Sequence, residues 1–121
     1  MPIKKILVVD DSPTERHCLN EILTKAGYQV SFALNGEEGV AKAKSEQPDL
    51  IVMDVVMPGL NGFQACRTIT QDPVTSHIPV ILCTTKNQDT DKIWALRQGA
   101  KAYVTKPVDE ADLLKKIAVL G

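Results

Sequence analysis

Three carboxylates stand directly after apolar runs, where buried strands are expected to end. Asp10 and Asp11 follow the run 6–9, and Asp54 follows the run 50–53. Carboxylates gathered in one place repel one another unless a cation or a lysine neutralises them. Because oxygen ligands without a neighbouring His or Cys favour a hard ion, these residues point to Mg²⁺ rather than Zn²⁺.

Hydroxyl and lysine side chains follow two further apolar runs. Thr84 and Thr85 come after the run 78–83, and Lys106 comes after the run 102–105. Each piece taken alone has an ordinary explanation, because an Asp pair before a helix is usually a cap and polar residues commonly end strands. Their occurrence together at four of the five expected strand ends favours a functional site.

An alternation of apolar runs with amphipathic stretches predicts how these side chains are positioned. Several runs are continuous, as in strands buried on both faces of a parallel sheet. The expected strands are 6–9, 28–33, 50–53, 78–83 and 102–105, and helix starts are indicated at Ser12-Pro13, Asn35-Gly36, Asn61-Gly62, 89–91 and Asp109. This pattern predicts an α/β fold with a doubly wound, five-stranded parallel sheet and five helices. In such a sheet functional groups gather at the carboxyl ends of the strands.

Length and composition predict one domain over residues 1–121. The 121 residues are 44% hydrophobic and 24% charged, as in a globular domain. A net charge of -1 argues against binding to nucleic acid. No apolar run is long enough for a signal peptide or a membrane span, and the three scattered cysteines suit a reducing compartment, so a cytoplasmic location is expected.

The motifs at the strand ends resemble those of a response-regulator receiver domain. The resemblance is carried by ILVVDDS at 6–12, MDVVMPGLNG at 53–62, Thr84-Thr85 and Lys106-Pro107, and it covers essentially the whole chain. Within the family the chain is most similar to stand-alone receivers of the chemotaxis-like systems that control type IV pilus twitching motility, on residues 10–15, 58–64 and 94–109. The resemblance implies the flavodoxin-like receiver fold and a single receiver domain without an output domain.

The resemblance also implies a chemical role for the clustered residues. Asp54 matches the phospho-acceptor of the family. Asp11 and Asp54 would coordinate Mg²⁺ directly, Asp10 mainly through water, and the backbone carbonyl of Val56 would be a further ligand. Lys106 would pair with the phosphoryl oxygens and with Asp54.

Further positions match the residues by which receivers sense the phosphoryl group. Thr84 would donate its hydroxyl to that group, and Tyr103 would change rotamer as Thr84 moves, although a half-buried strand tyrosine is an equally ordinary explanation. Thr85 occupies the small-residue position beside the acceptor. Pro107 matches a position where the preceding peptide bond is usually cis, which would direct Lys106 inward.

The expected function is a phosphorylation-dependent switch rather than an enzyme. The resemblance implies a histidine kinase as phosphodonor and a protein partner that binds the fourth helix, fifth strand and fifth helix, or else drainage of phosphate from a shared kinase. Two alternatives share the architecture. An aspartyl-phosphate phosphatase-like enzyme needs a second acid where Val56 stands, and a flavodoxin-like cofactor binder needs a glycine- and hydroxyl-rich loop where DDSP stands at 10–13.

Overall fold

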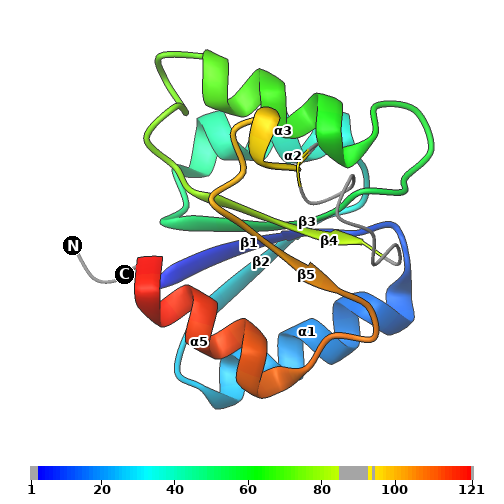
Figure 1. Cartoon of the computed structure of the whole chain (residues 1–121), viewed down its shortest axis with the longest axis vertical. Helices are drawn as coiled ribbons and strands as arrows, with labels where there is room; N and C mark the ends of the chain where they lie inside the picture. Colours follow the sequence, from blue (N-terminus) through cyan, green and yellow to red (C-terminus); the bar gives the residue numbers. More distant parts are fainter. Residues whose placement is uncertain (1–2, 85–92, 94, 121) are drawn as a thin grey trace.

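The computed structural model describes residues 3–84, 93 and 95–120. Within these residues, five strands form one parallel sheet in the order β2-β1-β3-β4-β5. The strands are β1 (Lys5–Val9), β2 (Gln29–Ala33), β3 (Leu50–Asp54), β4 (Val80–Thr84) and β5 (Ala102–Thr105). The predicted doubly wound, flavodoxin-like sheet is thereby confirmed (Figure 1).

Helices cover both faces of the sheet. Their bounds are α1 (Pro13–Lys25), α2 (Gly36–Glu46), α3 (Gly62–Gln71) and α5 (Glu110–Leu120). Residues 93 and 95–97 are helical where the fourth helix is expected, whereas its predicted start at 89–91 lies outside the described residues. Helices α1 and α5 lie on one face of the sheet, and α2 and α3 lie on the other (Figure 1). No helix in the described part of the chain has the length and hydrophobicity needed to cross a membrane.

Side-chain caps begin the helices where the sequence predicts them. Ser12 and Asn35 each accept a hydrogen bond from the backbone N–H three residues later. Asn61 forms a reciprocal capping box with the third residue of α3. Asp109 accepts from the backbone of the second residue of α5 at 3.1 Å. These caps satisfy N–H groups that the first turn of a helix leaves without partners.

The core consists of two layers on opposite faces of the sheet. Alternate residues of β1 and β3, such as Leu7 and Ile51, pack toward α2 and α3. Their neighbours, such as Ile6 and Val52, pack toward α1 and α5. Since successive strand side chains point to opposite faces, burial of both faces requires the continuous apolar runs seen in the sequence.

Two predicted site residues belong to the strands themselves rather than to the loops after them. Asp54 is the last residue of β3 and Thr84 the last residue of β4. Backbone hydrogen bonding continues past both, because Val55 N donates to Cys83 O at 2.9 Å and Lys106 N donates to Thr84 O at 2.8 Å. The sheet therefore fixes the backbone of both side chains.

Candidate functional site

Asp10, Asp54 and Lys106 meet at the carboxyl ends of β1, β3 and β5. Asp10 is only 1% exposed and Asp54 only 7%. The Nζ atom of Lys106 lies 3.0 Å from Oδ1 of Asp54 and 3.4 Å from Oδ2 of Asp10. The structure thus brings together side chains that are far apart in the sequence, as the strand-end rule predicts.

The start of α1 orients Asp10. Oδ1 of Asp10 accepts a hydrogen bond from the backbone N–H of Ser12 at 2.9 Å. The carbonyl of Asp10 accepts from Nη1 of Arg16 at 2.9 Å, and its N–H donates to Ala33 O at 3.1 Å. With one carboxylate oxygen held by Ser12, the other is directed toward Lys106.

The start of α3 lies against the backbone of Asp54. A Cβ atom built on Gly62 would stand 2.2 Å from the carbonyl oxygen of Asp54, so a larger residue does not fit there without movement. Gly62 N donates to Val55 O at 2.9 Å, and the backbone N–H of Val56 hydrogen bonds to the Asp54 carboxylate. The side chain of Val56 points outward and is 63% exposed.

Glu15 is a third acidic member of the cluster, and its place there was not predicted from the sequence. Its carboxylate contacts Nζ of Lys106. Carboxylate oxygens of Asp10, Glu15 and Asp54 lie within 4.8 Å of one another. An acidic residue in the first turn of a helix already has an explanation in the helix dipole, so its type alone carries no signal. The sequence feature that could have indicated this role is its position three residues after the Ser12 cap. That position lies in the first turn of α1, next to the carboxyl end of β1.

Burial raises the pKa of both buried carboxyls. The pKa of Asp10 is raised to about 6, chiefly by burial and further by its hydrogen bond with Glu15. Burial also raises the pKa of Asp54, although Lys106 opposes the shift. Burial disfavours the charged form of Glu15, but the hydrogen bonds from Lys106 and Asp10 outweigh it and lower the pKa of Glu15. For Lys106, burial is outweighed by Glu15 and Asp54, and its pKa is raised.

The charges of the cluster suit a divalent cation. When all are ionised, the three carboxylates of Asp10, Glu15 and Asp54 carry three negative charges, and the one ammonium of Lys106 leaves two of them uncompensated. The donor atoms of the cluster are oxygens, which hard ions such as Mg²⁺ prefer. The residues present therefore fit the predicted metal.

Two other predicted residues flank this cluster. Asp11 is exposed beside Asp10, and its carboxylate is not among the clustered oxygens of the described residues. The peptide bond between Lys106 and Pro107 is cis, as predicted.

The residues expected to sense a phosphoryl group occupy the adjoining strands. Thr84 is buried at the end of β4. Tyr103 is half-buried on β5, and Nζ of Lys116 from α5 lies 5.8 Å from the centroid of its ring. Thr85 lies outside the described residues.

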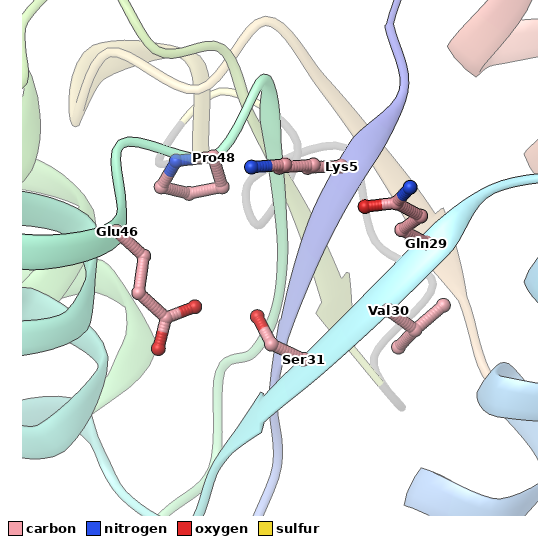
Figure 2. Close-up of a pocket in the computed structure, with 6 residues that line it drawn as sticks. All are labelled: Lys5, Gln29, Val30, Ser31, Glu46 and Pro48. Atoms are coloured by element: carbon pink, nitrogen blue, oxygen red, sulfur yellow. The ribbon is translucent and has the colours of Figure 1, made fainter.

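Two hollows differ in their relation to the site. One of about 340 Å³ lies at the amino ends of the strands, and Figure 2 shows the residues that line it: Lys5, Gln29, Val30, Ser31, Glu46 and Pro48. Another of about 280 Å³ lies between α1 and the chain after β5, lined by Thr14, Glu15, Cys18, Leu19, Ile22, Lys106, Pro107 and Val108. Only the second of these two includes residues of the acidic cluster.

Comparisons with known proteins agree with this arrangement. Residues 6–118 match the family described as the response regulator receiver domain. Protein PilH of Pseudomonas aeruginosa is 61% identical over 118 residues, which cover 97% of this chain and 98% of PilH. Response regulator PleD of Caulobacter vibrioides is 41% identical over 96% of this chain, which spans only 26% of PleD.

Solved structures with the same fold include two bacterial regulators. A putative response regulator from Chloroflexus aurantiacus superposes with a TM-score of 0.92 at 31% identity, covering 99% of this chain and 98% of that one. The chemotaxis protein CheY4 of Vibrio cholerae superposes with a TM-score of 0.90 at 31% identity, covering 98% of this chain and 99% of that one.

Proposed function

This chain belongs to the response regulator receiver family, and we propose that it accepts a phosphoryl group on Asp54 from a histidine kinase. The observation that carries the proposal is the placement of Asp54. Its carboxylate is buried at the end of β3, 3.0 Å from Nζ of Lys106 and beside Asp10. A nucleophilic oxygen so placed has a fixed cation at hand for the incoming phosphoryl oxygens.

The transfer uses side chains of the chain in defined roles. One carboxylate oxygen of Asp54 forms a bond to phosphorus while the bond between phosphorus and the donor's imidazole nitrogen breaks, and the electron pair of that bond goes to the imidazole. Lys106 pairs with the phosphoryl oxygens, and the hydroxyl of Thr84 donates to them. Thr85 matches the small-residue position of the family, and it lies outside the described residues. We propose that the chemistry of the domain is limited to its own phosphorylation and dephosphorylation, and the match to the response regulator receiver domain supports this.

Mg²⁺ is the proposed cofactor, held by Asp10, Asp11, Asp54 and the backbone carbonyl of Val56. The oxygen donors of the cluster and its two uncompensated negative charges support this choice. When bound, Mg²⁺ neutralises the crowded negative charge and so permits a phosphoryl group to approach a carboxylate.

The proposed output surface comprises the helical residues 93 and 95–97, β5 and α5. Ile93 and Leu96 are large apolar side chains, 51% and 48% exposed, on the first of these elements. Tyr103 lies on β5 in contact range of Lys116 from α5, so a change in its rotamer would alter what the surface presents. Phosphorylation would shift the equilibrium between two arrangements of Thr84 and Tyr103. The output is then binding of a protein partner or drainage of phosphate from the kinase.

The proposed pathway is a chemotaxis-like system that controls type IV pilus motility. The proposed location of this protein is the cytoplasm. Identity to PilH is 61%, against 41% to PleD. The match extends over 98% of PilH, so the likeness covers nearly the whole of that protein. We propose that the chain binds neither nucleic acid nor a membrane. The net charge of -1 supports the first of these two points.

Binding of beryllofluoride, an analogue of the phosphoryl group, tests the assignment of Asp54. We expect calorimetric titration to show binding only when Mg²⁺ is present, and we expect Asp54→Ala to abolish it. Asp72→Asn is the matched control, because Asp72 lies at the end of α3 and pairs with Lys44 at 3.2 Å. Binding that persists in Asp54→Ala would overturn the assignment, and phosphotransfer from a candidate kinase to the wild type but not to Asp54→Ala would extend it to the natural donor.

A further inference from the structure

Lys106 has more carboxylate partners than its proposed role requires. Its ammonium contacts Glu15 in addition to Asp54 at 3.0 Å and Asp10 at 3.4 Å. A lysine ammonium has three N–H donors, and three carboxylates already surround this one. An incoming phosphoryl oxygen would therefore compete with these carboxylates for Lys106.

We propose that Glu15 is an internal competitor of the phosphoryl group for Lys106, holding the ammonium in the unphosphorylated domain and releasing it when Asp54 is modified. The proposal rests on the function proposed for Asp54 and adds a role for a residue of α1. Glu15 is here a positioning residue, since it acts on the phosphoryl group through Lys106.

Among the three carboxylates, Glu15 has the greatest freedom to leave. Asp10 is tied to the backbone N–H of Ser12 and is 1% exposed, and Asp54 is fixed at the end of β3. The side chain of Glu15 is longer and 38% exposed, and it comes from the first turn of a helix at the edge of the site. It can turn toward solvent without breaking the sheet, whereas the other two cannot.

The charge of Glu15 acts in opposite directions on the two ligands of the site. Its carboxylate oxygen lies within 4.8 Å of oxygens of Asp10 and Asp54, so it adds negative charge where a divalent cation would bind. The same charge repels a phosphoryl group and competes for its lysine partner. Glu15 should therefore strengthen Mg²⁺ binding and weaken phosphoryl binding.

The variant Glu15→Gln separates these two effects, because it removes the charge and keeps the size of the side chain. Calorimetric titration with Mg²⁺ alone should give a dissociation constant about threefold higher than that of the wild type. Titration with beryllofluoride at saturating Mg²⁺ should give one about threefold to tenfold lower. Glu21→Gln is the matched control, because Glu21 lies on the same helix and pairs with His17 at 3.0 Å, away from the site. It should leave both constants unchanged.

The opposite signs distinguish the proposal from a purely structural role of Glu15. Loss of a helix contact alone would weaken the binding of both Mg²⁺ and beryllofluoride, or of neither. Either result in Glu15→Gln would overturn the proposal. Glu15→Asp keeps the charge on a shorter side chain and should bind beryllofluoride more tightly than the wild type without the loss of Mg²⁺ affinity; if Glu15→Gln does not fold, this variant decides the question. A wild type that fails to bind beryllofluoride would instead overturn the function proposed for Asp54.

Discussion

Replacing Asp10 by Asn should stabilise the metal-free domain while removing its response to Mg²⁺. Asp10 is almost fully buried beside two other carboxylates, and a single lysine faces all three. The amide oxygen of Asn can still accept the hydrogen bond that Ser12 N–H now donates to Oδ1 at 2.9 Å. The substitution therefore removes a buried charge and keeps the contact that orients the side chain.

The magnitude follows from the pKa of Asp10, which the folded protein raises from 3.8 to about 6. At 1.36 kcal/mol for each pKa unit, ionising Asp10 in the folded state costs about 3 kcal/mol of stability. Below the unfolded pKa, Asp10 is protonated in both states and the cost is absent. As pH rises toward 6 the folded state holds more protons than the unfolded state, so the wild type loses stability. Above pH 6 the cost is complete, and Asn never incurs it.

Urea unfolding in EDTA, followed by circular dichroism, measures this difference. The free energy of unfolding of Asp10→Asn should exceed that of the wild type by about 3 kcal/mol at about pH 8, and the gap should shrink toward about pH 4. Mg²⁺ at a hundred times its dissociation constant should add about 2.7 kcal/mol to the wild type and much less to the variant. Asp72→Asn is the control of opposite sign, because a backbone N–H and Lys44 lower the pKa of Asp72 and its loss should destabilise the fold. A gap for Asp10→Asn that does not change with pH would refute the reasoning.

Three other substitutions test the surroundings of Asp54. Gly62→Ala should destabilise the fold by about 2–3 kcal/mol, since the new Cβ would stand 2.2 Å from a backbone oxygen. Gly27→Ala is the comparison: its Cβ would meet open space, and only the φ of 99° is strained, so it should cost about 1–2 kcal/mol. Denaturation curves that show the reverse order would contradict this reasoning. Asn61→Ala removes the capping box of α3 and should cost about 1 kcal/mol in the same assay, where no loss would contradict the capping role. Val56→Asn replaces an apolar side chain two residues after the acceptor with an amide that can orient a water for hydrolysis of the acyl phosphate. It should shorten the phosphoryl lifetime about twofold to tenfold, measured by loss of radiolabel, and an unchanged lifetime would speak against it.

Much of the site could be predicted because it follows from the topology of the sheet. Asp10 and Asp54 come at the ends of two continuous apolar runs, and parallel strands buried on both faces bring such ends to one edge. Lys106 follows the same logic at the end of β5. The positions of these three residues could be predicted from the apolar runs along the sequence and the parallel direction of the strands alone.

The sequence could not predict the contacts that depend on the orientation of helices and side chains at the carboxyl edge of the sheet. The contact between Glu15 and Lys106 depends on the direction in which α1 leaves its cap, which no local pattern encodes. Asp11 is exposed beside the acidic cluster, and its role as a Mg²⁺ ligand stays a prediction. Strand ends were also placed too early at Asp54, since a polar residue can continue the backbone ladder as well as an apolar one.

The order of the strands bears on when the switch becomes usable during synthesis. Its carboxylates follow β1, begin α1 and end β3, but the lysine that pairs with them follows β5, the last strand to leave the ribosome. A nascent chain that has folded only its first three strands would hold several acidic groups together without their cation, and their repulsion would oppose premature closure of that edge. Under the proposed function, a chain that lacks β5 and Lys106 would lack the cation that pairs with the phosphoryl group.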